Sequence, residues 1–397
     1  MPLRVGIAEY FSGSVPYLDD ELLLEGYAML KSTIDDFLAT GVSVSTILHQ
    51  SFRSLSELYS VKVLWSAEGS AFEHNLKLLS QSVDYILLIA PEYILPTLLE
   101  QISSAEFLNS SPDSIRAVSD KCRFAKRLAE VGLEAPKSAC FEVDARASEI
   151  KAFCSEIGYP VAVKPAVGAG CEGLSIVEQE GVLEAAFKKA RQISPEGKIV
   201  VQKWCKGLAA SVSLIVSEDN IIPLSLNRQF IKVGSPNQAS TYLGGVVPLP
   251  HQLTKKAFEA ALKDVNAFKG LKGYVGVDLV LADKPLVLEV NPRITVSYIG
   301  LSRVLEGGVA NLMIKMAAKS ANSPLRLKGY VSFIKATLPP QSKVEHAKVL
   351  CSPIKRNGKR CFLMAKGDSY ENSLQQLKAD INLFQAKVDV NFDDLSA

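Results

Sequence analysis

The sequence is short of the features that mark membrane, secreted or nucleic-acid-binding proteins. It has no run of about 18 apolar residues, so no membrane-spanning helix is predicted. Neither sign of charge dominates, with 44 Lys and Arg residues against 42 Asp and Glu residues, so a nucleic-acid partner is not indicated. The first residues, MPLRVGIAEYFSG, lack the apolar core of a signal peptide. We therefore expect a cytoplasmic protein that acts on small molecules, and whether it forms a homo-oligomer is left open.

Histidine and paired cysteine are also scarce. The four histidines are isolated in the sequence, which argues against a histidine-ligated metal. The seven cysteines are scattered singly, and no CxxC pair occurs. An odd number of single cysteines is typical of reduced thiols rather than of a disulfide framework or a zinc site. We therefore expect the cysteines to be free.

The chain does have enough hydrophobic residues for a large core. It contains 397 residues, of which 48% are hydrophobic, and this size favours about two to four domains. Strand-like runs such as LRVGIAEY alternate with helical patterns over 1–115, which predicts an α/β domain with a parallel sheet. A mixed α+β pattern follows to residue 325, and residues 326–397 repeat it weakly.

The segment LVLEVNPRIT at 286–295 sets three polar groups into an apolar strand. Because side chains alternate along a strand, Glu289, Asn291 and Arg293 share one face. The turn ADKP joins this strand to the preceding one, so strand pairing brings Asp278 beside Glu289. Two carboxylates and an amide oxygen suit Mg²⁺ or Mn²⁺, and Arg293 would face a transferred phosphoryl group or an anionic substrate. The alternative is an edge strand with a solvated polar face.

Gly168, Gly170 and Gly173 satisfy the pattern GxGxxG within GYPVAVKPAVGAGCEGLSIVE. A dinucleotide fingerprint needs a strand before this pattern and a helix after it, whereas here both flanks read as strands. The loop is therefore predicted to join a hairpin and to lay backbone amides over phosphates, with Lys164 adding a positive charge. The alternative is an ordinary glycine-rich turn beside a surface lysine.

The segment GKIVVQKWCKGLAASVSLIV reads as two strands with a break at Gln202–Cys205. Backbone groups of such a connecting segment commonly bind adenine, with apolar side chains on the two faces of the base. The alternative is that Trp204 and Cys205 only contribute to packing.

Taken in order, VAVKPAVGAGCEG, VVQKWCKG and the pair GVDLVL and LVLEVNPR resemble the ATP-grasp superfamily of carboxylate–amine ligases. SDKCRFAKRLAEVGLEAP is similar to the lead-in helix of that family. The resemblance covers about 115–325 and implies an ATP-grasp fold, α/β and α+β, in which ATP lies between two lobes. It divides this region into a small lobe at 116–196 and a large lobe at 197–325. The N-terminal domain, 1–115, precedes them in the sequence, and a small C-terminal extension, 326–397, follows.

The resemblance also implies roles for individual residues. One departure is Ala209, which stands where many family members carry a glutamate that binds ribose. Phosphate binding falls to Lys121 and Lys164, adenine binding to Gln202, Lys203, Trp204 and Cys205, metal binding to Asp278, Glu289 and Asn291, and stabilisation of the transferred phosphoryl group to Arg293 and Lys164.

A narrower resemblance lies outside the ATP-binding blocks. EYFSGS, LLLEGYAML, LLIAPE, SLNRQFI, TYLGGVVPLPH and NPRITVSYIGL resemble the tyramine–glutamate ligase branch, which works in the biosynthesis of methanofuran-class one-carbon cofactors. This resemblance implies that ATP activates the γ-carboxylate of glutamate as an acyl phosphate, which the amine of tyramine or tyrosine then attacks. The rivals are a ligase that adds glutamate to a pterin-type cofactor or joins two amino acids, and a catalytically silent nucleotide-binding homologue.

Substrate contacts are expected from residues near the ends of the strands, where open α/β sheets bind ligands. Arg228 would pair with a substrate carboxylate, unless it is simply solvated, and Tyr242 would line the site of an aromatic acceptor, unless it only anchors its loop. The full set is Asn227, Arg228, Tyr242, Thr295, Ser297, Glu9, Ser12 and Gly13.

Overall fold

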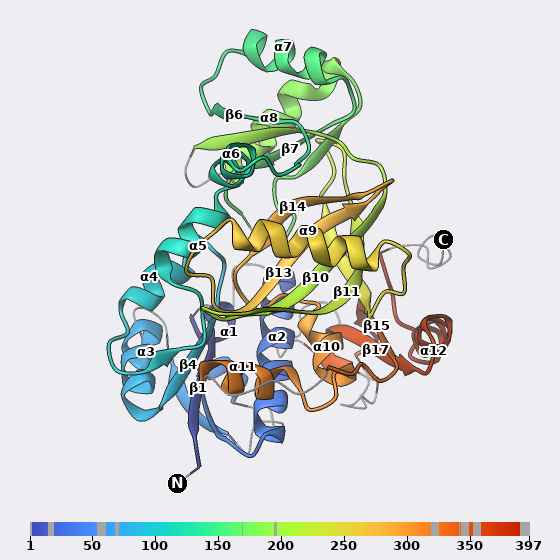
Figure 1. The fold of residues 1–397 in the computed structure, drawn as a ribbon. Coiled ribbons are helices and arrows are strands. Elements are labelled where there is room, and N and C mark those ends of the chain that lie inside the picture. Colours follow the sequence, from blue (N-terminus) through green and yellow to red (C-terminus); the bar gives the residue numbers. More distant parts are fainter. Residues whose placement is uncertain are drawn as a thin grey trace.

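The computed structural model describes most of the chain, and the fold given below refers to those residues. They are residues 2–14, 20–53, 61–67, 71–168, 170–193, 197–318, 325–340, 342, 349–351 and 359–389. Over these ranges the chain builds three β-sheets with helices packed on them (Figure 1). No helix within the same ranges is long and apolar enough to cross a membrane.

A parallel sheet forms the N-terminal part, which confirms the α/β prediction. Its strand order is β3-β2-β1-β4-β5, and every neighbouring pair is parallel. Val5 and Ile7 of β1 are fully buried, as expected of a central parallel strand covered on both faces. The elements are β1 (Arg4–Glu9), α1 (Tyr10–Ser14), α2 (Asp20–Ala39), β2 (Ser43–His49), η1 (Gln50–Phe52), β3 (Lys62–Ser66), α3 (Ala71–Ser82), β4 (Tyr85–Ile89), α4 (Leu95–Glu100) and β5 (Glu106–Phe107).

A smaller antiparallel sheet of order β6-β9-β7-β8 forms the lobe at the top of Figure 1. Strands β7 and β8 pair antiparallel on either side of the glycine loop, which confirms that this loop joins a hairpin. The elements that lead into this lobe and build it are α5 (Pro112–Ser119), α6 (Lys121–Glu130), β6 (Ser138–Glu142), α7 (Ala147–Ile157), β7 (Val161–Pro165), β8 (Ser175–Val177), η3 (Glu180–Val182), α8 (Leu183–Ile193) and β9 (Lys198–Lys203).

The largest sheet has the order β14-β13-β10-β11-β12-β15-β17-β16, and its pairs are antiparallel. The described strands of 326–397 extend this sheet through the pairing of β15 with β12. The exact domain boundaries stay a prediction. The elements are β10 (Leu208–Val216), β11 (Ile221–Lys232), β12 (Thr241–Val247), α9 (Thr254–Asn266), β13 (Gly273–Leu281), β14 (Pro285–Asn291), α10 (Tyr298–Val304), α11 (Val309–Ala317), β15 (Tyr330–Leu338), β16 (Val349–Cys351), β17 (Lys359–Gly367) and α12 (Tyr370–Leu383).

Helix α2 ties the N-terminal domain to the large lobe. Its buried residues join those of α10 and α11 in one hydrophobic core. Within that core Asp36 of α2 accepts hydrogen bonds from the hydroxyl of Tyr298 at 2.6 Å and from the backbone N–H of Ala310 at 2.9 Å. A buried carboxylate that is satisfied by the partner domain fixes where α2 lies.

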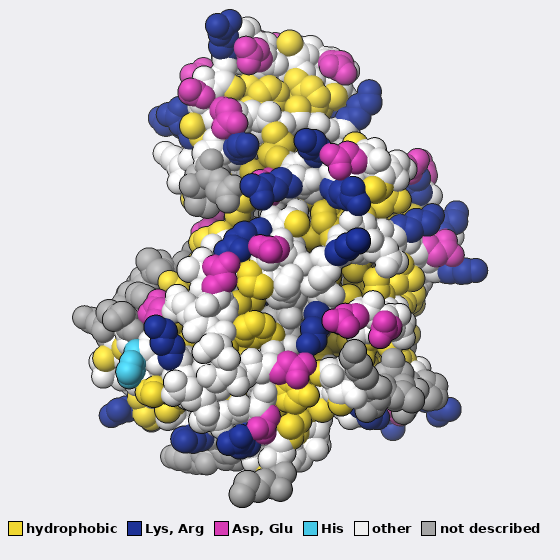
Figure 2. All heavy atoms as spheres, turned by 60° about the vertical axis from the view of Figure 1, so that its left-hand side comes forward, with side chains coloured by type: hydrophobic (Ala, Val, Ile, Leu, Met, Phe, Trp, Pro, Cys, Tyr) yellow, Lys and Arg dark blue, Asp and Glu magenta, His cyan; other side chains and the backbone are white. Residues whose placement is uncertain are grey.

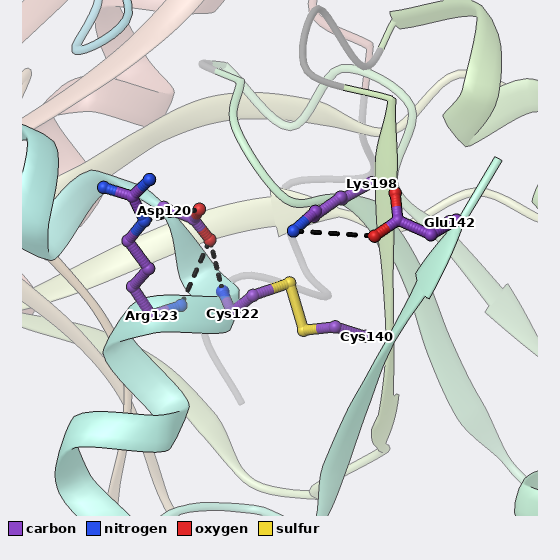
Figure 3. Close-up of a disulfide and its surroundings, with 6 residues drawn as sticks. All are labelled: Asp120, Cys122, Arg123, Cys140, Glu142 and Lys198. Carbon is purple, nitrogen blue, oxygen red and sulfur yellow. Dashed lines mark hydrogen bonds and ion pairs between the residues drawn. A yellow bond between two sulfur atoms is a disulfide. The ribbon is translucent and has the colours of Figure 1, made fainter.

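Cys122 and Cys140 form a disulfide, so the expectation that all cysteines are free is wrong for this pair. Cys122 lies at the start of α6 and Cys140 on β6, and their Cα atoms are 5.9 Å apart although 18 positions separate them in sequence (Figure 3). Asp120 caps α6 by accepting hydrogen bonds from the backbone N–H groups of Cys122 and Arg123. The cystine therefore fixes the first turn of α6 against the small-lobe sheet.

We expect the disulfide to stabilise the fold. Closing a loop of this length removes about 3 kcal/mol of chain entropy from the unfolded state. The double variant Cys122→Ser, Cys140→Ser should therefore lose about 2–3 kcal/mol of unfolding free energy in urea titrations. As a control, dithiothreitol should lower the stability of the wild type to that of the double variant and leave the double variant unchanged. Peptide mapping without a linked Cys122–Cys140 pair would contradict the disulfide.

Candidate active site

A cavity of about 340 Å³ lies between the small-lobe sheet and the largest sheet, and Glu25 of α2 also lines it. It receives side chains from β7, β9, β11, β12, β13 and β14, so elements far apart in sequence converge there. The predicted site residues that line it are Lys121, Lys164, Gly168, Gly170, Gln202, Lys203, Trp204, Cys205, Tyr242, Asp278, Glu289, Asn291, Arg293, Thr295 and Ser297.

Asp278 and Glu289 lie directly opposite each other on β13 and β14, as the strand pattern predicts. Asp278 accepts a hydrogen bond at each carboxylate oxygen, from the amide of Gln229 at 2.9 Å and from the amide of Asn291 at 3.0 Å. These two amides hold the carboxylate in one orientation toward Glu289.

Cations from the other lobe balance this acidic pair. The ammonium of Lys121, at the start of α6, lies 3.0 Å from the carboxylate of Glu289. Burial alone would raise the pKa of Glu289, but Lys121 and Lys164 outweigh it and hold that pKa below its usual range. Burial together with the negative charge of Glu289 raises the pKa of Asp278. The two carboxylates therefore differ in how readily they take up a proton.

The donor set fits a divalent cation of the magnesium type. Asp278 and Glu289 supply hard carboxylate oxygens, and Asn291 supplies an amide. Mg²⁺ is commonly bound by one or two carboxylates and completes its shell with water and substrate phosphate. The described residues contain no group of three or more His, Cys, Asp and Glu side chains that could enclose a metal without such help. A divalent cation would also relieve the repulsion that raises the pKa of Asp278.

Arg293 is held by a residue that the sequence analysis did not single out. Its Nε lies 2.7 Å from the carboxylate of Glu92, which follows β4 and is 6% exposed. Burial would lower the pKa of Arg293, but Glu92 outweighs it and raises that pKa, so the guanidinium stays charged. Glu92 ends the segment LLIAPE, directly after a strand-like apolar run. Because ligands of α/β domains bind near strand ends, this position could have marked Glu92 as a candidate site residue.

The connecting segment Gln202–Cys205 lies at the end of β9, and all four of its residues line the cavity. The ammonium of Lys203 donates to the backbone carbonyls of Gly158 at 3.0 Å and Tyr159 at 3.4 Å. Ala209 also lines the cavity, so no carboxylate reaches it from that position. Adenine binding by this segment stays a prediction.

The glycine loop needs backbone conformations that most residues avoid. Gly170 and Gly173 have φ angles of +66° and +70°, and Cys171 between them has φ +66°. Burial raises the pKa of the Cys171 thiol to about 12, so the thiol stays protonated. Ser240 of the large lobe donates a hydrogen bond at 2.8 Å to the carbonyl of Leu174, which ties the end of the loop across the cavity.

Six of the predicted site residues do not line the cavity. Arg228 lies one position from Gln229 and therefore on the opposite face of β11, with its guanidinium 5.9 Å from the ring centroid of Phe230. Asn227 is buried in hydrogen bonds with Ser213 and Ser225. The others are Gly173, Glu9, Ser12 and Gly13.

Glu9 is part of the N-terminal domain's internal hydrogen bonding. Its carboxylate accepts from the backbone N–H groups of Phe11 and Ser12 and from the Ser12 hydroxyl. Burial raises the pKa of Glu9 to about 7. Gly13 is required for space, because a Cβ there would lie 2.5 Å from the ring of Phe72. These contacts give the EYFSGS segment a structural role within the N-terminal domain, and we assign it no substrate contact.

Comparison with known proteins shows what this chain is similar to. Residues 118–297 match the ATP-grasp domain family. Tyramine–L-glutamate ligases from Methanocaldococcus fervens and Methanocaldococcus jannaschii are 28% and 27% identical over 75% of this chain, covering 89% and 84% of their own lengths. An ATP-grasp superfamily protein from Archaeoglobus fulgidus has a TM-score of 0.62 at 23% identity, covering 92% of this chain and 99% of its own. Biotin carboxylase from Campylobacter jejuni has a TM-score of 0.73 at 16% identity, covering 96% and 92%.

We expect Glu92→Gln to destabilise the protein by leaving Arg293 buried without its ionic partner. The loss should be about 3 kcal/mol in urea titrations, because an unpaired buried charge is strongly unfavourable. The double variant Glu92→Gln, Arg293→Met should lose less than the sum of the two single variants. Additive losses would show that the two side chains do not interact.

We expect nucleotide binding to depend on pH through Lys164. Burial, aided by the nearby charge of Lys121, lowers the pKa of Lys164 to about 8, so its ammonium is charged below that pH and neutral above it. Affinity for ATP, measured by calorimetry without divalent cations, should therefore be full below about pH 8 and fall as the pH rises toward the ordinary lysine pKa of about 10.4. In Lys164→Arg the guanidinium stays charged, so this fall should disappear. The same pH profile in both proteins would contradict the assignment.

Proposed function

Because residues 118–297 form an ATP-grasp domain, we propose that the protein is an ATP-dependent ligase that forms a C–N bond between a carboxylate and an amine. The reaction would release ADP and phosphate. The observation that carries the proposal is the convergence of Asp278, Glu289, Lys121 and Lys164 from two lobes on one cavity.

We further propose that the acid is glutamate and that its γ-carboxylate is joined to tyramine or tyrosine. Two relatives named tyramine–L-glutamate ligase align with three quarters of the chain and support this substrate pair. The pathway we assign to it is the biosynthesis of methanofuran-type one-carbon cofactors.

The chain's own residues would act mainly by position and charge. Lys121 and Lys164 would bind the phosphates of ATP, and Asp278, Glu289 and Asn291 would hold Mg²⁺. When bound, the cation neutralises charge on the terminal phosphates. Arg293, fixed by Glu92, would bind the γ-phosphoryl group as it moves.

The carboxylate of the acid substrate would attack the γ-phosphorus, the bond to ADP would break, and an acyl phosphate would form. The neutral amine would then attack the acyl carbon, phosphate would leave with the bonding electron pair, and the amine nitrogen would lose a proton to solvent. No protein nucleophile is needed, because orientation and electrostatic stabilisation suffice for phosphoryl transfer of this kind. The protonated thiol of Cys171 agrees with that absence of covalent catalysis.

The proposal predicts ADP release and amide formation when the protein is given ATP, Mg²⁺, glutamate and an amine panel. Mass spectrometry should detect γ-glutamyltyramine or γ-glutamyltyrosine as the product. Product with a pterin cofactor and none with either aromatic amine would end the assignment of substrate. Absence of ADP release with every pair would indicate a silent nucleotide-binding protein.

Glu289→Gln should lower turnover by about 100-fold, because the residue holds the metal and balances Lys121. The matched control is Glu134→Gln, a carboxylate 70% exposed in its side chain that pairs with Lys284 outside the cavity. The control should keep wild-type turnover, and circular dichroism should show both variants folded. Full turnover in Glu289→Gln would refute the metal assignment.

A further inference from the structure

A second charged cluster lies beside the cavity, away from the residues assigned to ATP. Lys335 of β15 is 2% exposed, and its ammonium donates to the carboxylates of Glu25 at 2.6 Å and Glu21 at 2.8 Å. Arg360 of β17 donates to Glu21 from the other side at 2.7 Å. Burial would lower the pKa of Lys335, but the two carboxylates outweigh it and raise that pKa, so the lysine keeps its charge.

Glu25 is the member of this cluster that lines the cavity. Glu21 and Glu25 are four residues apart on α2 and therefore lie on one face of that helix. Lys335 bonds to Oε1 of Glu25, and Oε2 takes no part in that contact. Because Asp36 fixes α2 to the large lobe, Glu25 is presented to the cavity from a rigid element.

Tyr242 gives a second, independent indication that a ligand binds in the cavity. Its side chain lines the cavity and is 7% exposed, and its hydroxyl has no hydrogen-bond partner among the described residues. A buried hydroxyl without a partner is unfavourable, so such groups usually bond to a ligand or to water. Tyr242 lies on β12, between β11 with Gln229 and β15 with Lys335.

The cavity-lining residues of the largest sheet can be placed by its strand order. Asp278 and Glu289 lie on β13 and β14, Gln229 bonds to Asp278 from β11, and Tyr242 follows on β12. Glu25, bonded to Lys335 of β15, lines the same cavity and is close enough to Arg293 to help raise the pKa of that guanidinium. Ile231, Val233 and Val296 add apolar wall to the cavity. A ligand whose nitrogen lies at Glu25 and Tyr242 would therefore have its reacting group in the same cavity as Asp278, Glu289 and Arg293.

Three of the four described cationic side chains that line the cavity already have partners within the protein. Among the described residues that line the cavity, Lys121 is paired with Glu289, Arg293 with Glu92, and Lys203 with backbone carbonyls. Lys164 lies on β7 of the small lobe. A ligand's carboxylate beside Glu25 would thus meet a like charge, and the nearby Arg293 is already paired with Glu92, whereas an ammonium would gain a charge-assisted hydrogen bond.

We propose that Glu25 and Tyr242 form the subsite for the acceptor amine, with Glu25 binding its ammonium group before the amine reacts. The substrate class is a primary amine with an apolar or aromatic body and no carboxylate next to the nitrogen. This inference rests on the proposed ligase function and selects tyramine over tyrosine. The ammonium gives up one proton to solvent before attack, and Glu25 orients the nitrogen for that step.

Calorimetric titration of tyramine into the full-length protein tests the subsite without turnover. Glu25→Gln should weaken binding by about 10- to 100-fold, the loss expected for one charge-assisted hydrogen bond. The matched control is Glu21→Gln, which touches the same Lys335 but does not line the cavity and should bind tyramine as the wild type does. Equal affinity in Glu25→Gln and the wild type would overturn the subsite, as would a wild type that does not bind tyramine.

Two further measurements do not depend on Glu25→Gln folding correctly. Wild-type protein should bind tyramine at least about 10-fold more tightly than tyrosine, and Tyr242→Phe should weaken tyramine binding while leaving ATP binding unchanged. Equal affinity for the two amines, or no effect of Tyr242→Phe, would overturn the proposal.

Steady-state kinetics separates this inference from the proposed function. In a ligase assay Glu25→Gln should raise KM for the amine and leave KM for glutamate and ATP unchanged. A rise in KM for glutamate instead would place Glu25 at the acid substrate and overturn the proposal. Tyramine binding that depends on Glu25, together with no amide product, would support the subsite and refute the ligase function.

Discussion

The site depends on holding two carboxylates side by side in a partly buried cavity. Asp278 and Glu289 repel each other, and burial removes much of the water that would screen them. Strand register forces them together, while the compensating charges of Lys121 and Lys164 come from α6 and β7 of the small lobe. The carboxylates of the large lobe are therefore stabilised by the ammonium groups of the small lobe. A nucleotide with its cation would enter a site whose charged groups are already in position.

The N-terminal domain completes this site. Glu92, which follows β4, pairs with Arg293, and Glu25 of α2 also lines the cavity. Both are brought there by packing of α2 and the parallel sheet against the large lobe. The face in Figure 2 shows Lys and Arg side chains interspersed with Asp and Glu, in keeping with the balanced composition.

What the sequence predicts correctly is what short-range geometry determines. The pairing of Asp278 with Glu289 follows from a tight turn and a two-residue repeat, and the hairpin around the glycine loop from strand-like flanks. Long-range packing determines the rest. No local pattern brings Cys122 to Cys140. Alternation alone does not say which face of β11 meets the cavity, so it does not reveal that Gln229 lines the cavity and Arg228 does not.

The cluster of Glu21, Glu25, Lys335 and Arg360 is not explained by stability alone. Well-packed apolar residues usually stabilise a core at least as well as a buried ionic network does. A network of this kind is more valuable for fixing direction, because Lys335 bonds to both Glu21 and Glu25 while Arg360 holds Glu21 from the other side. Lys335 restrains one oxygen of Glu25 and so holds a carboxylate in place at the cavity wall, which is what recognition of a small cation requires.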